Sequence, residues 1–195
     1  MILAYAVALA GTVGAPEGLR VLVRGPLECF YRKREDTPQA SEDEVREFFT
    51  ANQSLFARAD ILEFRFPTVL HGIKELEGFV ARHQAAILSE LERLRGLAQL
   101  TVYLPKSATP GSEHAQSGTE YLQKKSARAR EQIEEIDAAR AGAGSELRDS
   151  LLQGNRLLLL VPRQLAPDVA QKIRANTGLD VAGPFPPSAF AKLLS

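Results

Sequence analysis

The pattern of hydrophobic and polar positions changes period several times along the chain, and each change predicts a new element. Apolar side chains fill almost every position from Ile2 to Leu9, which is typical of a strand buried on both faces. Two further strands are predicted from Leu19 to Arg24 and from Leu27 to Lys33, because Gly25 and Pro26 separate two runs with strand-like composition.

A helix is predicted to begin at Ser41, since Ser41 and Glu44 form an S-x-x-E capping box. Apolar residues then recur at helical spacing as far as Phe56. The period returns to two from Ile61 to Phe66, which predicts a strand with three apolar side chains on one face: Leu62, Phe64 and Phe66.

A long amphipathic helix is predicted from Lys74 to Arg95, with Gly96 at the position of a C-cap glycine. The stretch from Gln99 to Leu104 alternates again and predicts a strand. A loop rich in small residues follows from Pro105 to Gln116.

A second capping box, Ser117 with Glu120, predicts a long charged helix that breaks near Gly142 and resumes from Ser145 to Gln153. The rest of the chain predicts a strand, a short helix and a last strand, which run from Arg156 to Val161, from Pro167 to Gly178 and from Leu179 to Ala182.

This order of elements predicts an α+β protein with two lobes. From residue 61 onward the elements follow the βαββαβ order of a ferredoxin-like sheet, interrupted by a helical insertion at about residues 117–153. The first 60 residues predict a smaller sheet with one helix, too short for a full repeat of that unit. The expected lobes are therefore residues 1–60 and 61–195.

Composition narrows the classes of partner. The 24 basic and 24 acidic side chains cancel, so no long-range field gathers nucleic acid or anionic lipid. Cys29 is the only cysteine, which excludes an internal disulfide and any site with several cysteine ligands. A reducing cytoplasm is the expected compartment.

The apolar run in residues 1–15 has two interpretations, a secretory h-region that ends in small residues or a buried strand. A signal peptide carries basic residues ahead of its apolar run, and none precedes Ile2. The strand is therefore favoured. No run reaches the roughly 20 apolar residues of a membrane span, so no membrane partner is expected.

Side chains that could support catalysis or bind a metal are few. His71 and Glu75 lie four residues apart and could share a helix face as metal ligands, but with only two ligands a loop histidine is the favoured interpretation. His83 is expected to be a half-buried packing histidine, and Cys29 a small buried hydrophobe. Phosphate-binding motifs of the G-x-x-x-x-G-K-[ST] and G-x-G-x-x-G types are absent, so no enzymatic activity, cofactor or metal is expected.

A basic cluster in the long charged helix is the strongest case for nucleic acid or an anionic membrane: Lys124, Lys125, Arg128 and Arg130. Four acidic residues follow on the same helix: Glu131, Glu134, Glu135 and Asp137. A solvated face of mixed charge is therefore the favoured interpretation.

Four segments in the last two thirds of the chain match the pattern of one protein family. Residues 64–69 are similar to L-R-F-G-T-V, with Pro67 where glycine is usual, and residues 91–103 combine L-E-R-L, Gly96 and Q-L-T-V-Y, with Gln99 where glutamate is common. Residues 117–122 are similar to S-G-x-x-Y-L, and residues 183–190 to G-P-W-P-P-Y-S-F. In this order and spacing, the segments resemble the GvpL/GvpF family of gas vesicle accessory proteins.

The resemblance implies a two-lobed α+β protein with a ferredoxin-like part, which assembles or lines the protein shell of gas vesicles. It implies the small hydrophobic major shell protein and other gas vesicle accessory proteins as partners, and no catalysis. The alternative is a ferredoxin-like domain that binds a ligand or acts as an enzyme on an unknown substrate, because that fold hosts many functions. The residues expected to matter lie in the motifs and the basic cluster: Arg65, Phe66, Thr68, Tyr121, Lys124, Lys125, Arg128, Pro184, Phe185, Pro187 and Phe190.

Three local expectations follow. Arg65 is predicted to be held by a carboxylate or by backbone carbonyls between the lobes, with an exposed strand arginine as the alternative. The helix from Ser117 to about Arg140 should be the most exposed element, either as a partner surface or as a solvated helix packed on the sheet. The tail from Gly183 to Phe190 should dock on the body, rather than serve as a proline-rich ligand for a partner.

Overall fold

The structure is a computed structural model, and it describes residues 1–39, 41–105 and 118–193, with the backbone alone for residues 118, 120, 121 and 124. The chain forms two compact units. The first unit contains Met1–Leu97 and takes back the C-terminal segment from Phe185 onward, and the second unit is Ala98–Pro184.

This division differs from the boundary expected between residues 60 and 61. The strand after residue 60 pairs with the first strand of the chain, and the helix that follows packs on the same sheet. Strand pairing joins residues far apart in the chain, so the break in hydrophobic period at residue 60 did not mark the end of a unit.

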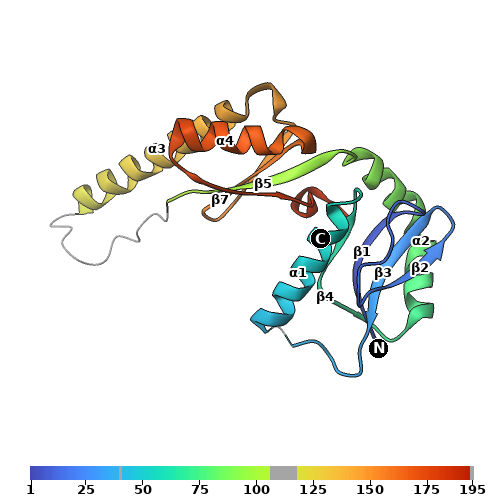
Figure 1. The fold of residues 1–195 in the computed structure, drawn as a ribbon. Coiled ribbons are helices and arrows are strands. Elements are labelled where there is room, and N and C mark those ends of the chain that lie inside the picture. The colour runs from blue at the N-terminus through green and yellow to red at the C-terminus, as the bar shows by residue number, and fades with distance from the viewer. Residues whose placement is uncertain (40, 106–117, 194–195) are drawn as a thin grey trace. The chain divides into compact units, whose positions relative to one another are not determined.

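The first unit is a four-stranded sheet with a helix on each face (Figure 1). The strand order is β2-β3-β1-β4, and β1 pairs antiparallel with both β3 and β4. Its elements are β1 (Ile2–Leu9), β2 (Arg20–Arg24), β3 (Leu27–Lys33), α1 (Glu42–Phe56), β4 (Leu62–Leu70) and α2 (Ile73–Arg93). β1 is buried along almost its whole length, as expected for a central strand with both faces covered.

β4 bulges where it carries the motif of residues 64–69. Ala4 faces Thr68 and Ala6 faces Glu63, so four residues of β4 lie opposite the single residue Tyr5. Phe64 consequently packs on Phe79 of α2, whereas the next alternate residue, Phe66, packs on Phe48 of α1. The expectation of one face for Phe64 and Phe66 was wrong, because the bulge interrupts the period of two between them.

A loop of residues 10–19 connects β1 to the edge strand β2, and a buried acid on β3 holds it. The carboxylate of Glu28, 3% exposed, accepts hydrogen bonds from the backbone N–H of Gly11 (3.1 Å) and of Val13 (3.0 Å). It also accepts one from the hydroxyl of Thr12 (3.3 Å). These bonds satisfy donors that a loop lying on the sheet would otherwise leave unpaired.

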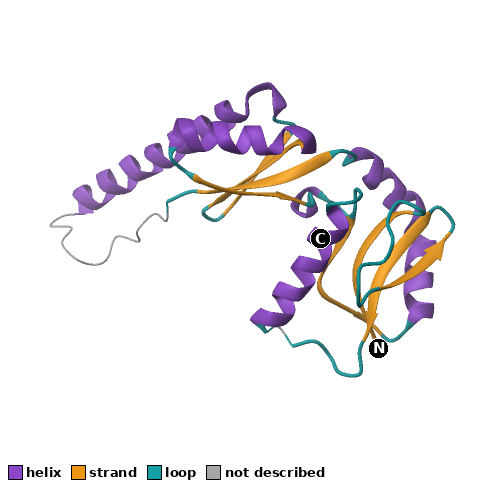
Figure 2. Ribbon diagram, in the orientation of Figure 1, coloured by secondary structure: helices purple, strands orange, loops and turns teal. Residues whose placement is uncertain are grey.

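The second unit combines strands and helices (Figure 2) in the ferredoxin-like order β-α-β-β-α-β. Its strands are arranged as β6-β7-β5-β8. Both helices lie on one face of the sheet (Figure 1). Its elements are β5 (Leu97–Tyr103), α3 (Gly118–Ala143), β6 (Asp149–Gln153), β7 (Arg156–Pro162), α4 (Ala166–Thr177) and β8 (Asp180–Phe185). The predicted α+β class and the two-part organisation are therefore confirmed.

The long helix α3 is the first crossover helix of this unit and not an insertion. The helix predicted from Ser145 to Gln153 is mostly the strand β6, which pairs with β7 without a shift in register. Gln153 faces Arg156 across the two residues Gly154 and Asn155, and Gly154 has φ 59°. The Gly-Asn pair is a hairpin signal that the sequence analysis missed.

Two helix ends that the sequence predicted from local signals are confirmed. The Ser41 side chain accepts a hydrogen bond from the backbone N–H of Glu44 (3.3 Å) at the start of α1. Gly178 closes α4 in the left-handed conformation, with φ 69°. Ser117 of the second capping box lies outside the described residues.

Candidate interaction surfaces

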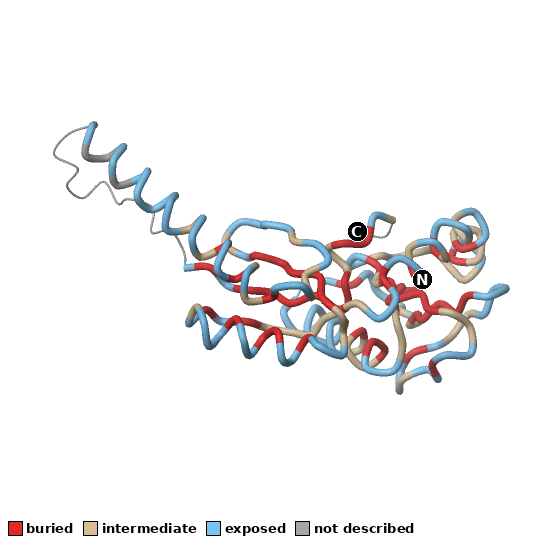
Figure 3. Tube along the Cα trace, turned by 90° about the horizontal axis from the view of Figure 1, so that it is seen from above, coloured by how far each residue is buried: buried red, intermediate tan, exposed pale blue. Residues whose placement is uncertain are grey.

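The helix α3 is buried at its C-terminal end, and the described side chains of its N-terminal half are exposed (Figure 3). Ile136, Ala139 and Ala143 are buried in the second unit, where α3 packs on α4. Towards the N-terminus, Leu122 is 64% exposed and Ile133 is 57% exposed. These two residues lie eleven positions apart, close to three helical turns, so they share one face of the helix.

The charged residues of α3 that the sequence singled out lie on this exposed half. The Lys125 side chain is exposed, and Arg128 is exposed and has an interaction partner. The side chains of Tyr121 and Lys124 lie outside the described residues. The motif and the basic cluster are thus only partly placed by the structure.

The C-terminal segment docks on the first unit, and we call residues 185–193 the strap. Phe190 is 8% exposed, and its carbonyl oxygen accepts a hydrogen bond from the Arg93 guanidinium of α2 (2.6 Å). The backbone N–H of Lys192 donates to the carboxylate of Glu90 (3.0 Å). Phe185 packs edge-on against Phe49 of α1, with ring centroids 5.5 Å apart. These contacts agree with the predicted docking of the tail.

Burial is uneven along the strap and the residue that precedes it. Pro187 is buried along with Phe190, whereas Pro184 and Phe185 are half-buried. Pro184 and Phe185 also form the end of β8, an edge strand where a proline is tolerated. Phe185 is therefore a lesser anchor than Phe190.

The predicted role of Arg65 is contradicted. Its side chain is exposed, and within the described parts of the chain its guanidinium has neither an ion pair nor a hydrogen bond. Its backbone carbonyl accepts a hydrogen bond from the Thr68 hydroxyl (2.6 Å), which closes the bulge of β4. Phe66 is half-buried against α1. The motif of residues 64–69 thus shapes a strand rather than a charged junction.

A polar cluster under the strap was missed by the sequence analysis. Glu63 of β4 lies near two polar groups, the Ser188 hydroxyl of the strap and the Asn52 amide of α1. Burial raises the pKa of the Glu63 carboxyl to about 7, and the two polar groups offset part of that increase. Glu63 occupies an ordinary polar position of an alternating strand, so no local signal could have shown that its carboxyl is buried.

A second carboxylate at the strap has the opposite shift. The hydrogen bond from Arg93 holds the pKa of Glu90 below its usual range, against the raising effect of burial. Cys29 is fully buried, and burial raises the pKa of its thiol to about 12. Its expected role as a small buried hydrophobe is confirmed.

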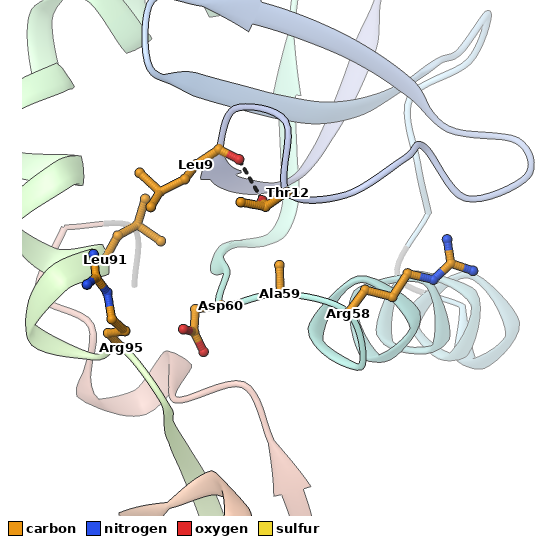
Figure 4. A pocket seen from close by; sticks show the side chains of 7 residues that line it. All are labelled: Leu9, Thr12, Arg58, Ala59, Asp60, Leu91 and Arg95. Atoms are coloured by element: carbon orange, nitrogen blue, oxygen red, sulfur yellow. Dashed lines mark hydrogen bonds between the residues drawn. The ribbon is translucent and has the colours of Figure 1, made fainter.

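Figure 4 shows a pocket of about 340 Å³ in the first unit, at the end of β1 and of α2. Its polar groups serve the local backbone: the Thr12 hydroxyl donates to the Leu9 carbonyl (2.6 Å), and the Asp60 carboxylate accepts from the N–H of Gly96 (3.1 Å). The Arg58 guanidinium points away from the other lining side chains (Figure 4). The lining residues are Leu9, Thr12, Arg58, Ala59, Asp60, Leu91 and Arg95, and they bring no nucleophile and base together.

The histidines within the described ranges take part in local contacts of the fold. The backbone N–H of His71 donates to the Glu75 carboxylate (2.7 Å), so this acid is engaged in the turn that precedes α2. His83 is half-buried and packs on Phe79, with ring centroids 4.6 Å apart. No three acidic, histidine or cysteine side chains gather as a metal site among the residues that the structure describes.

Among the helices in the described parts of the chain, none combines the length and the apolar character needed to cross a bilayer.

The fold defines an α+β protein in which a bulged sheet with a helix on each face is followed by a ferredoxin-like unit, and in which the C-terminus returns to the first unit. Comparison of the sequence with protein-family models and with curated proteins finds no match. Solved structures, however, share this fold over the whole chain.

Two of these structures are gas vesicle proteins. The first is GvpF from Microcystis aeruginosa, with a TM-score of 0.76, 12% identity and coverage of 98% of this chain and 99% of that chain. The second is GvpF from Anabaena sp. PCC7120, with a TM-score of 0.75, 13% identity and coverage of 98% and 96%. The resemblance to the GvpL/GvpF family that the sequence motifs suggested is confirmed at the level of the fold.

Proposed function

We propose that this protein takes part in the assembly of gas vesicles or is a minor component associated with their shell, and that it acts through contacts with other proteins. The observation that carries the proposal is the likeness to two GvpF proteins over almost the full length of both chains. A ferredoxin-like unit alone would be weak support, because many unrelated proteins contain one. Here the likeness extends to the first unit and the strap.

The proposed partners are the major gas vesicle shell protein and other gas vesicle accessory proteins, met in the cytoplasm at the growing vesicle. The proposal assigns the protein no catalytic role. Binding to a small hydrophobic partner calls for an exposed apolar surface, and α3 offers one in the face that carries Leu122 and Ile133. Lys125 lies at its rim and would favour a partner with acidic groups.

Coexpression with the major shell protein tests the function directly. The expected result is a complex that copurifies with this chain, together with fewer or misshapen vesicles when this chain is left out. Absence of both the complex and any effect on vesicles would overturn the proposal.

The α3 surface has its own test. Replacing Leu122 and Ile133 together by Asp should weaken binding of the shell protein at least about tenfold, because two exposed apolar contacts are lost and desolvation of the new charges is added. Ala138→Asp on the same helix is the matched control, since Ala138 is exposed outside this face. Equal binding by both variants, with unchanged circular dichroism, would remove α3 from the interface and leave the assembly role to be tested by coexpression.

A further inference from the structure

Each of the two sheets has one edge strand that resists further pairing and one that is open to it. The edges are β4 and β2 in the first sheet and β8 and β6 in the second. β4 is bulged and contains Pro67, and β8 contains Pro184, so neither offers a regular row of backbone groups. β2 and β6 are five-residue strands without proline, and each pairs with its inner neighbour without a shift in register. These two edges can therefore accept another strand.

Both open edges turn the backbone groups of two alternate residues outward. Two-residue turns join β2 to β3 and β6 to β7. The pair that flanks such a turn is hydrogen-bonded, and hydrogen-bonded pairs then alternate along the ladder. The N–H and C=O groups that point away from the sheets therefore belong to four residues, Val21 and Val23 on β2 and Ser150 and Leu152 on β6. In agreement, the Ser150 N–H donates to the Asp149 carboxylate (2.8 Å).

Apolar side chains are exposed on both open edges. Val23 of β2 is 61% exposed, and on β6 Leu151 is 38% and Leu152 is 45% exposed. Charged side chains along an edge strand discourage pairing, but here the charges of both strands stand only at the strand ends. The middle of each edge is thus suited to an apolar partner.

The ends of the two strands are complementary in charge. β2 begins with Arg20 and ends with Arg24, and both side chains are exposed. Within the described parts of the chain, neither guanidinium has an ion pair or a hydrogen bond. β6 begins with Asp149 and ends with Gln153, whose amide oxygen can accept a hydrogen bond. A second β2 in antiparallel pairing would place arginine opposite arginine, which is unfavourable, so β6 is the better partner for β2.

We propose that β6 of one copy of this chain adds to β2 of a second copy as an antiparallel strand, so that copies associate head to tail. The register that matches the outward backbone groups pairs Val23 with Ser150. Two residues further along, Val21 pairs with Leu152, and each of these pairs exchanges two hydrogen bonds between N–H and C=O groups. The second copy thus completes the edge of the first sheet with the edge of its own second sheet.

The same register also matches the side chains. It places Asp149 opposite Arg24 and Leu151 opposite Leu22, in the non-hydrogen-bonded pairs where side chains come closest. In the single chain the Asp149 carboxylate binds the N–H of Ser150. When a carbonyl of the partner strand takes this N–H, the carboxylate is released to bind Arg24. Backbone, apolar side chains and charges therefore agree on one register.

The contact is heterologous, because it joins two different surfaces of the chain. Each added copy presents a new open edge, so the association continues beyond a pair unless the chain of copies closes into a ring. The contact uses neither the exposed half of α3 nor the strap. It is therefore independent of the proposed function, and the failure of one does not decide the other.

Sedimentation velocity of the full chain at increasing concentration and low salt tests the association. The mean mass should rise with concentration, and it should fall again when salt is added, because the Asp149–Arg24 pair is screened. A mass equal to that of one chain at every concentration would overturn the proposal.

Two charge variants test the partners within the interface. Arg24→Asp alone and Asp149→Arg alone each place like charges opposite one another, so each should associate about tenfold more weakly than the native chain. An equimolar mixture of the two variants should recover the native association, because each variant then meets the opposite charge on the other. Single variants that associate like the native chain, or a mixture that does not recover, would overturn the proposal. Circular dichroism checks that both variants fold.

Disulfide trapping tests the register without any change in charge. Copies with Val23→Cys, mixed with copies that carry Ser150→Cys and oxidised, should form a crosslinked pair, since these positions lie opposite on one face. Copies with Leu151→Cys are the matched control and should not crosslink to Val23→Cys, because the side chain at 151 points to the other face. Cys29 is buried and present in all samples. Equal crosslinking of both mixtures, or crosslinking of Leu151→Cys copies with each other through a pairing of β6 with β6, would overturn the proposal.

Discussion

In the first unit a loop crosses from β1 to the edge strand β2, whereas in the second unit the helix α3 makes the corresponding crossing from β5 to β6. The two sheets nevertheless have the same strand order, in which the second, third, first and fourth strands of the unit lie side by side. From the sequence, the first 60 residues were expected to be too short for this arrangement. A crossing needs only enough chain to span the neighbouring strand, and a loop of ten residues is enough.

The two crossings satisfy their backbone groups in different ways. A helix pairs its own N–H and C=O groups, so α3 needs only an apolar face towards the sheet, which Ile136, Ala139 and Ala143 supply. A loop has no such internal pairing, and in the first unit the buried Glu28 accepts the N–H groups of Gly11 and Val13 instead. The buried acid on the sheet thus supplies hydrogen-bond acceptors that a helix supplies from its own backbone.

The largest expected effect concerns a close approach in the second unit. Gly183 has φ 120°, and a Cβ at this position would lie 2.8 Å from the Gln99 carbonyl oxygen of β5. Gly183→Ala should lower the free energy of unfolding by about 3–5 kcal/mol, because positive φ and overpacking add. Urea denaturation measures the loss.

Gly154→Ala is the control for this variant. Gly154 also has positive φ, 59°, but no atom lies within 4 Å of its Cβ position. This substitution should cost about 1 kcal/mol, from the backbone conformation alone. Equal losses in the two variants would show that the close approach of β8 to β5 has no energetic weight.

The next effect tests the loop crossing of the first unit. Glu28→Ala removes the acceptor of three hydrogen bonds and should destabilise this unit by about 2–3 kcal/mol, since two buried backbone N–H groups lose their partner. Hydrogen exchange should show lost protection at Gly11 and Val13, with β5 and β7 unchanged. Thr12→Val removes only a hydroxyl and should cost about 1 kcal/mol. If these amides keep their protection from exchange in Glu28→Ala, the loop keeps its conformation without the Glu28 carboxylate.

The smallest effects on stability come from two helix glycines, one on α3 and one on α2, and they are expected to have opposite signs. A Cβ on Gly142 of α3 would lie 3.1 Å from Cγ1 and 3.3 Å from Cα of Ile173 on α4, so Gly142→Ala should cost about 1 kcal/mol. On α2, Gly78 has only the end of the Arg82 side chain nearby, at 3.7 Å. Gly78→Ala should therefore stabilise the first unit by about 0.5–1 kcal/mol through helix propensity. The midpoint temperature of thermal unfolding measures both changes. A midpoint that rises in both variants would contradict close packing of α3 on α4.

Part of the candidate site was accessible from the sequence. The three prolines of the tail and the apolar residues beside them predicted a docked segment, and Phe190 is buried in the way that this pattern suggested. Arg65 was assigned wrongly, because a charged residue between two aromatic residues gave no hint of the bulge that leaves it exposed. Glu63 was not singled out at all, although it is the group that meets Ser188 of the strap.

The sequence by itself determined most of the helices and strands and several of their ends, as at Ser41 and Gly178, because these depend on residues a few positions apart. The tertiary structure alone decided that β4 joins the sheet of β1, that residues 149–153 form a strand, and that the chain returns at Phe185 to the first unit. It also decided the burial of Glu28 and the surroundings of Glu63. Strand pairing and the burial of a carboxyl are set by groups that are distant in the chain, and no local period records them.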